Sequence, residues 1–309
     1  MATGRSENCA TGKSSPGPWN YEEVALNESS HAFAGWIGRQ ERLDEELSPA
    51  PVQAMLATLD DGERRLGSGD PLPPLWHWLY FLPRVPASRI GKDGHPQRGG
   101  FLPPVELPRR MFAGARLHFR HPLLIGKPAS RTGTVRDISQ KHGASGALVF
   151  VTVEYQIEQD GRVCVEEVQD IVYREPGARI AAPKVIDLPA PPAGAWTRTI
   201  TPDPILLFRF SALTFNAHRI HYDRPYAINE EGYPGLVVHG PLTAVLLLDL
   251  VRRHSNRPVI AYSFRGRAPL FDLAPFRLSA QLENDTVGLE AIGPDGGVAM
   301  TATATLGDA

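Results

Sequence analysis

The sequence is poor in cysteine and has no long apolar run. Only Cys9 and Cys164 occur among its 309 residues, one in a polar stretch and one in a strand-like segment. A disulfide framework is therefore not expected, which favours a reducing compartment. The longest apolar run, residues 242–251, is interrupted by a threonine and an aspartate. It is shorter than the roughly 20 apolar residues of a membrane-spanning helix, so we expect no membrane segment.

An excess of charge of one sign is also missing. The formal net charge is −2, and charged residues make up 21% of the chain. Without a broad basic field, nucleic acid is not an expected partner. The N-terminus lacks the apolar core of a secretory signal. We therefore expect a cytoplasmic protein whose partners are neither membranes nor nucleic acids.

Composition divides the chain into four stretches. Residues 1–30 are rich in serine, glycine, asparagine and proline, which predicts a flexible tail. Residues 178–194 are rich in proline and alanine, as interdomain linkers are. These boundaries leave an N-terminal domain over residues 31–177 and a C-terminal domain over residues 195–309.

Each predicted domain combines one apolar helix with several long strands. The predicted helices are Ser48–Leu59 with Ser48 as N-cap, a short one within Pro71–Leu82, and about Gly240–Arg253, with an ordered loop over residues 83–114. The predicted strands are Ala115–His121, Arg131–Ile138, Ala147–Gln159, Arg162–Tyr173, Trp196–Ile200, Ile205–Ser211, Val259–Gly266, Pro275–Glu283, Thr286–Ile292 and Val298–Leu306. This inventory predicts an α+β fold in which curved antiparallel sheets each wrap a helix.

A polar turn over residues 215–223 (FNAHRIHYD) holds the main candidates for chemistry. It places Asn216, His218, His221 and Asp223 between the predicted strand and the apolar helix, where such groups can converge on one pocket. A histidine can serve as both general acid and general base near neutral pH. A zinc site of two histidines and an aspartate is the rival interpretation. No accompanying cysteine or HExxH pattern supports it, so no metal is expected.

The glycine that starts the apolar helix is a second candidate. Gly240 ends the segment PGLVVHG, and a backbone N–H at a helix N-terminus can stabilise a developing oxyanion. A plain cap or close packing is the alternative role for this glycine. His239 is a candidate substrate contact, with a structural role as its alternative.

Arginines are the candidates for an anionic group of the substrate. An arginine can bind a carboxylate through two parallel hydrogen bonds and can also contact phosphates. For any single arginine, a solvated surface charge is the alternative. The candidates are Arg109, Arg110 and Arg116 around the long loop, and Arg265 and Arg267 in a strand-like stretch.

Two segments carry a resemblance to a known family. Phe210–Ala227 (FSALTFNAHRIHYDRPYA) and Pro234–Gly240 (PGLVVHG) resemble the active-site region of the MaoC-like hydratases. Within that family the chain is most similar to type 2 hydroxyacyl-thioester dehydratases and to mesaconyl-C4-CoA and itaconyl-CoA hydratases. The first half resembles the N-terminal dehydratase-like domain of that subgroup through PPLWHWLYF (73–81), GGFLPPVELPRRMFAGARLHF (99–119) and EEVQDIVYRE (166–175).

The resemblance covers about residues 33–306 and implies a double hotdog fold with the working site in the C-terminal hotdog. The general family motif is D-x-N-P-[LIV]-H. Here Asn216 stands at the aspartate position, His218 at the asparagine position, Arg219 at the proline position and His221 at the histidine position. An amide cannot take a proton, so a scheme with two acid–base residues does not transfer directly.

The resemblance implies a hydro-lyase that adds water reversibly to an enoyl-CoA. In the hypothesis that follows, Asn216 orients the water, His221 moves the proton, and the Gly240 N–H stabilises the enolate-like oxygen. No cofactor is expected, and CoA would enter between the hotdogs. The subgroup indicates a C5-dicarboxylyl-CoA, mesaconyl-C4-CoA or itaconyl-CoA, which gives citramalyl-CoA. Arg109, Arg110 or Arg116 would then bind the free carboxylate.

Two alternatives stay open at this point. The chain could be a 3-hydroxyacyl-thioester dehydratase of fatty acid metabolism, which needs a long apolar pocket. It could also be a thioester-binding module without turnover, because the motif aspartate is absent. Two hotdogs in one chain already imitate a hotdog dimer, and a further homodimer is compatible with the sequence.

Overall fold

The structure, a computed structural model, describes residues 31–143 and 146–308. The predicted tail over residues 1–30, including Cys9, lies outside the described residues. No helix among those described is long and apolar enough to cross a membrane. In the described part, residues 178–194 contain no helix or strand.

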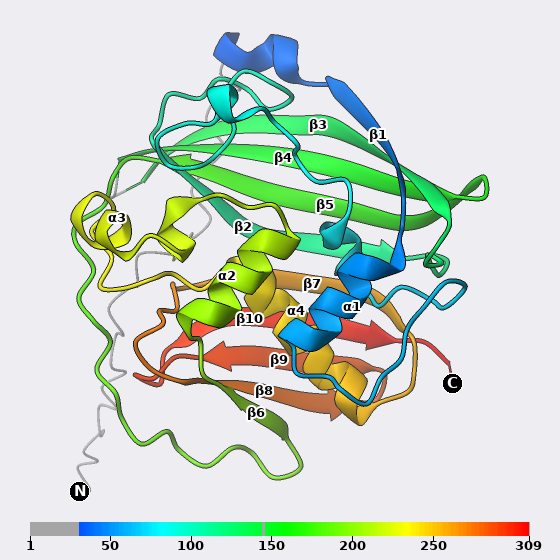
Figure 1. Ribbon diagram of the computed structural model, residues 1–309. Coiled ribbons are helices and arrows are strands. Elements are labelled where there is room, and N and C mark those ends of the chain that lie inside the picture. The colour runs from blue at the N-terminus through cyan, green and yellow to red at the C-terminus, as the bar shows by residue number, and fades with distance from the viewer. Residues whose placement is uncertain (1–30, 144–145, 309) are drawn as a thin grey trace, which may run out of the picture.

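One antiparallel sheet of ten strands organises the described chain (Figure 1). The strand order is β1-β3-β4-β5-β2-β7-β10-β9-β8-β6, so strands before the 178–194 segment form one half and strands after it form the other. The strands are β1 Gln40–Glu46, β2 Arg109–Phe119, β3 Pro128–Gly143, β4 Gly146–Gln159, β5 Arg162–Arg174, β6 Trp196–Ile200, β7 Val259–Gly266, β8 Phe276–Glu283, β9 Thr286–Ile292 and β10 Val298–Leu306.

The two halves join through the antiparallel pair β2–β7, whose register runs from Gly114↔Arg265 to His118↔Ala261. Gly114 is required for this close approach, because a Cβ there would lie 2.3 Å from the carbonyl oxygen of Phe264. The chain thus builds one continuous sheet from two sets of strands. The expected α+β class, a double hotdog, agrees with this architecture.

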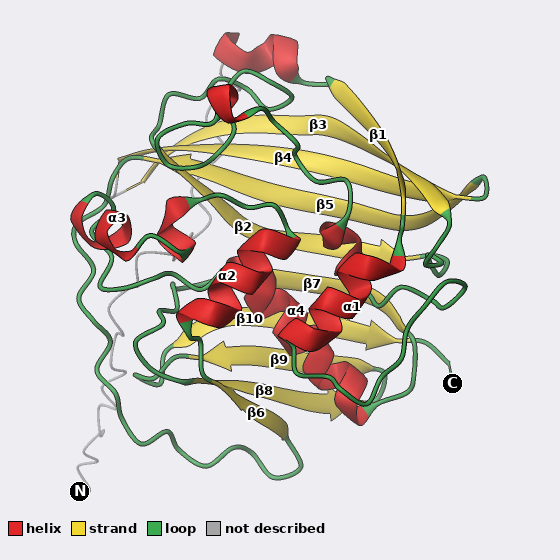
Figure 2. Cartoon of the chain, viewed as in Figure 1, coloured by secondary structure: helices red, strands yellow, loops and turns green. Residues whose placement is uncertain are grey.

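Helices cover one part of this sheet more than the rest (Figure 2). The α-helices are α1 Pro49–Thr58, α2 Pro204–Leu213, α3 Arg224–Asn229 and α4 Gly240–His254, and the 3₁₀ helices are His31–Trp36, Trp76–Leu79, Ala87–Arg89 and Arg219–His221. The strands β6, β8, β9 and β10 contact α4, which is buried from Leu242 to Val251. In the first half, α1 instead packs against α2 and the Trp76–Leu79 helix.

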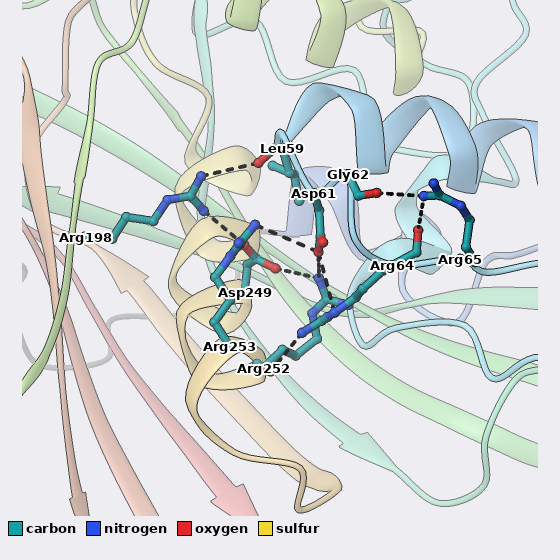
Figure 3. A network of polar contacts seen from close by, with 9 residues as sticks. All are labelled: Leu59, Asp61, Gly62, Arg64, Arg65, Arg198, Asp249, Arg252 and Arg253. Carbon is teal, nitrogen blue, oxygen red and sulfur yellow. Dashed lines mark hydrogen bonds and ion pairs between the residues drawn. The ribbon is translucent and has the colours of Figure 1, made fainter.

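A charged network fixes the C-terminal end of α4 (Figure 3). Asp249, the aspartate that interrupts the apolar run, accepts hydrogen bonds from Arg198 at 3.1 Å, Arg252 at 2.5 Å and Arg253 at 2.7 Å. Arg198 also donates to the carbonyl of Leu59, just after α1. A buried carboxylate needs such partners because desolvation penalises its charge. The network therefore ties α4 to α1 and β6.

The structure differs from the predicted elements in specific places. Ile205–Ser211 lies in a helix, α2, and the predicted strand there is wrong. Asp203 caps this helix by accepting from the Leu206 N–H at 2.7 Å, with Pro204 in the first turn. The Asp203-Pro204 pair in the sequence therefore indicated the start of a helix.

Smaller differences concern the first half. Strand β1 (Gln40–Glu46) was not predicted, because its burial alternates without a run of apolar residues. Strand β2 begins at Arg109, so the predicted loop over residues 83–114 ends earlier. Ser48 precedes α1 but makes no side-chain capping hydrogen bond; its carbonyl accepts from the Tyr80 hydroxyl at 2.5 Å instead.

Candidate active site

The polar turn that the sequence singled out follows α2 directly. Asn216 donates its backbone N–H to the carbonyl of Ser211 at 2.8 Å, and its side-chain oxygen accepts the backbone N–H of His218 at 3.0 Å. Phe215 has φ 49°, in the left-handed region that non-glycine residues seldom adopt. These bonds fold the turn so that His218 precedes the short helix Arg219–His221.

His221 is buried, and one of its ring nitrogens forms a hydrogen bond with the backbone. Its Nδ1 lies 2.7 Å from the carbonyl oxygen of Val237. A carbonyl can only accept, so Nδ1 carries the hydrogen and the lone pair of Nε2 remains for chemistry. Val237 is itself held by a hydrogen bond to the Ile220 carbonyl at 3.0 Å. The backbone therefore fixes both the tautomer and the orientation of His221.

His239 lies flat against His221, with ring centroids 3.6 Å apart and planes 17° apart. Its Nε2 is 2.8 Å from the Ser211 hydroxyl, and its buried Nδ1 has no hydrogen-bond partner among the described residues. His239 is the N-cap residue of α4, so the segment that positions Gly240 also supports the His221 ring.

A loop of the first half adds two residues that the sequence reasoning missed. His95 lies against His218, with ring centroids 4.0 Å apart, and His218 meets His221 edge-on at 5.4 Å. Asp93 is 2.9 Å from His95 Nδ1. The pattern Asp-Gly-His within a glycine-rich loop was the available signal, but no spacing in the sequence connects it to residues 216–221.

Burial keeps this group of histidines neutral. It lowers the pKa of His221 to about 4, although the Val237 hydrogen bond opposes the shift. Burial and the charge of Arg110 lower the pKa of His95 to about 4, against the opposing effect of Asp93. Burial and neighbouring rings also hold the pKa values of His218 and His239 far below the usual one. At neutral pH each ring therefore offers a lone pair.

Three cavities meet at His95 and Arg110, which line all of them. The first, about 670 Å³, is mainly apolar and contains Asn216. The third, about 210 Å³, is lined by His218, His221 and Gly240 as well as Asn216. Asn216, His221 and the start of α4 are thus brought together, as predicted. A Cβ at Gly240 would meet only the Phe112 carbonyl oxygen, at 3.9 Å.

The structure separates the candidate arginines. Arg110 lines all three of these cavities, and Arg267 lines the third. Arg109 lines the second cavity but forms an ion pair with Glu231. Arg116 pairs with Asp170 at 2.7 Å on a half-exposed strand face, and neither it nor Arg265 lines any of these three cavities.

Asp223 lies away from the cavities. It caps α3 by accepting the Tyr226 N–H at 3.1 Å, and it pairs with Arg219 at 2.7 Å. The rival zinc site of His218, His221 and Asp223 therefore does not assemble. Another trio, Asp93, His95 and His218, brings its polar atoms within 4.8 Å of one another. The 2.9 Å contact between Asp93 and His95 has hydrogen-bond length, and His218 contacts His95 through its ring, so we interpret Asp93 and His95 as a hydrogen-bonded pair beside His218.

Comparison with known proteins agrees with this architecture. The chain is 61% identical over 279 residues to mesaconyl-C4-CoA hydratase of Chloroflexus aurantiacus, covering 90% of this chain and 99% of that one. The crystal structure of HtdX of Mycobacterium tuberculosis matches with a TM-score of 0.62 at 19% identity, over 86% of this chain and 99% of that one. Another Mycobacterium tuberculosis protein, which has a double hotdog fold, matches with a TM-score of 0.53 at 13% identity, over 87% and 96%.

Fold and site together define a double hotdog hydratase or dehydratase of acyl thioesters. The model of hydroxyacyl-thioester dehydratase type 2 matches residues 75–272, which is more than half of the chain. The chain belongs to that family and is a hydro-lyase, which disfavours the alternative of a binding module without turnover.

Proposed function

We propose that this hydro-lyase hydrates a C5-dicarboxylyl-CoA, mesaconyl-C4-CoA, to citramalyl-CoA. The observation that carries the proposal is the 61% identity to a mesaconyl-C4-CoA hydratase over 90% of the chain. The residues around the cavities support it chemically, because they offer a proton carrier, an oxyanion donor and a cation in one place.

The water oxygen bonds to the β-carbon, and the electron pair of the double bond moves toward the thioester oxygen. The Gly240 N–H, at the start of the 15-residue helix α4, stabilises that developing charge together with the helix dipole. His221 Nε2 exchanges the proton at the α-carbon, while the Asn216 amide orients water by hydrogen bonding. Dehydration runs through the same steps in reverse.

Arg110 is the proposed partner of the free carboxylate. It borders the same cavities as His95 and Asn216. Among the described residues it forms no ion pair, and its side chain hydrogen-bonds the Tyr173 hydroxyl. The carboxylate of mesaconyl-C4-CoA sits on the β-carbon, so its pairing with Arg110 would place that carbon beside the histidines. The third cavity, about 210 Å³ and lined by His221 and Gly240, has room for a short acyl group.

The proposal also includes itaconyl-CoA as a second substrate with the same product, and no cofactor. A cytoplasmic location is part of the proposal and is supported by the scarcity of cysteine. A homodimer is proposed as well, and sedimentation of the purified chain at several concentrations tests it.

The test is turnover of mesaconyl-C4-CoA, itaconyl-CoA and crotonyl-CoA side by side, with mass spectrometry to detect the gain of water. Efficient hydration of the dicarboxylyl esters with weak action on crotonyl-CoA is the expected result. Arg110→Met should raise KM for the dicarboxylyl esters much more than KM for crotonyl-CoA. A preference for long straight-chain enoyl thioesters would instead identify a fatty acyl dehydratase.

A further inference from the structure

The loop that carries His95 is built as an ordered turn. Gly91 donates its N–H to the His95 carbonyl at 2.7 Å, and Gly94 donates to the Gly91 carbonyl at 3.0 Å. The same loop docks on the active-site turn, because the Arg219 N–H bonds to the Asp93 carbonyl at 2.9 Å. A residue from the first half is thereby fixed beside His218 and His221 in the second half.

Asp93 and His95 form a carboxylate–imidazole dyad. His95 Nδ1 lies 2.9 Å from one carboxylate oxygen of Asp93, and the other oxygen accepts the His95 backbone N–H at 3.0 Å. Burial alone would raise the pKa of Asp93, but the hydrogen bonds from His95 and the charge of Arg110 lower it to about 2. An ionised carboxylate only accepts hydrogen bonds. Nδ1 of His95 therefore carries the hydrogen, and Nε2 is left as a base.

The site needs such a base. Asn216 occupies the place where the family motif has an aspartate, and an amide cannot accept a proton. No aspartate or glutamate side chain among the described residues lines the first or third cavity. His95 borders both of them, and it is hydrogen-bonded to the carboxylate of Asp93.

We propose that the Asp93–His95 dyad is the second acid–base group of this active site and takes the proton from the attacking water. This inference rests on the proposed hydration. The water oxygen bonds to the β-carbon, one water proton moves to His95 Nε2, and the double-bond electron pair becomes the enolate. The proton then passes through His218 to His221 Nε2, which delivers it to the α-carbon. No net proton or co-reactant is required.

The charges around His95 fit this cycle. Burial disfavours its cationic form, as do the charges of Arg110 and Arg98, while Asp93 favours that form. A substrate carboxylate paired with Arg110 would offset the arginine charge and make His95 a stronger base when substrate is bound. The ring of His218 lies between the other two, with centroids 4.0 Å from His95 and 5.4 Å from His221, which is the position that a relay requires.

The test measures kcat and KM of His95→Gln, Asp93→Asn and the exposed control His118→Gln on whichever thioester the unaltered enzyme hydrates fastest. This choice keeps the test valid if mesaconyl-C4-CoA is not the substrate. His95→Gln should lower kcat by about 100-fold or more with KM changed only a few-fold, in the range of general acid–base catalysis. Asp93→Asn should lower kcat by about tenfold or more, and the control should keep normal values.

A second variant separates catalysis from loss of structure. Adding Asn216→Asp to His95→Gln restores a carboxylate at the motif position and should recover kcat by about tenfold. Near-normal kcat in His95→Gln would overturn the proposal, because His221 would then serve both steps alone. A failed rescue in a folded double variant would also overturn it. So would a stoichiometric metal ion found by elemental analysis whose removal abolishes activity.

Discussion

One ring nitrogen of His221 holds the side chain in place, and the other is available for proton transfer. Nδ1 is committed to the Val237 carbonyl, and the face of the ring lies on His239. The ring therefore cannot rotate without breaking a buried hydrogen bond, which costs about 1–3 kcal/mol. This restraint keeps Nε2 available in one orientation throughout the reaction.

Replacing His221 with alanine should lower kcat by about 100-fold to 10,000-fold, because proton transfer to the α-carbon loses its carrier. Steady-state kinetics measure the effect. The control is His118→Ala, because His118 is an exposed histidine on β2. Retention of most activity in a folded His221→Ala protein would contradict the assignment.

The sequence predicted His221, Asn216 and Gly240 together because they lie within one segment of 25 residues. His95 could not be predicted in the same way, since it lies more than a hundred positions earlier in a loop. Only the pairing of the two halves brings it to His218. Arg110 was one of five candidate arginines, and the structure alone distinguishes it by the cavities it borders.

At the scale of elements, both ends of α4 contribute to the active site. Its N-terminus carries Gly240, and its C-terminal turn carries the Asp249 network with Arg198, Arg252 and Arg253 (Figure 3). Displacement of the C-terminal turn would also shift the N-terminus, because a helix moves as a rigid rod over this length. The network is thus a remote support of the oxyanion donor.

Asp249→Asn should destabilise the protein by about 3 kcal/mol, since three arginines would face an amide in place of a buried carboxylate. Denaturant unfolding measures the change. The matched control is Asp285→Asn, which breaks an ion pair of the largely exposed Asp285 with Arg257 and should cost at most about 1 kcal/mol. Equal effects of the two substitutions would refute the role given to the network.

The turn Gly91–His95 is a second element on which the site depends. Gly94 has φ +91°, and a Cβ there would lie 1.7 Å from the Ala217 carbonyl oxygen. Gly94→Ala should therefore push the loop away from the polar turn and lower kcat by about tenfold or more. Gly100→Ala, in the same long loop with open space around it, should leave kcat unchanged. Kinetic assays of both variants check this prediction.

Element prediction succeeded where alternation or a buried helix was obvious, as in β6, β7, β9 and α4. It failed at α2, whose residues Ile205 and Phe208 are exposed and so gave no clean helical face. Local apolar character resembled a strand there, while the cap at Asp203 decided the outcome. The strand β1 was missed because tertiary pairing with β3, rather than its own side chains, holds it in the sheet.

At the scale of the whole molecule, four neutral histidines make folding sensitive to mild acid. His95, His218, His221 and His239 all have lowered pKa values, so the unfolded chain binds more protons than the native one below about pH 6.5. The free energy of unfolding should therefore fall as pH drops from about 6.5 toward 4, and be fully regained above that range.

Thermal unfolding at pH 7.5, 6.5, 5.5 and 4.5 measures this dependence. His239→Asn should flatten the curve relative to the unaltered protein, because one of the groups that gains a proton on unfolding is removed. The exposed His118→Asn should leave the slope unchanged. A melting temperature constant from pH 7.5 to 4.5 would contradict the linkage.

The β2–β7 pairing has a consequence for any attempt to divide the chain. Cutting within residues 178–194 and separating the halves would leave β2 and β7 each with a row of unpaired backbone N–H and C=O groups. Such open edges recruit other strands and lead to aggregation. In the intact chain β2 and β7 protect each other's edges by pairing. Each half is therefore expected to aggregate when it is separated from the other.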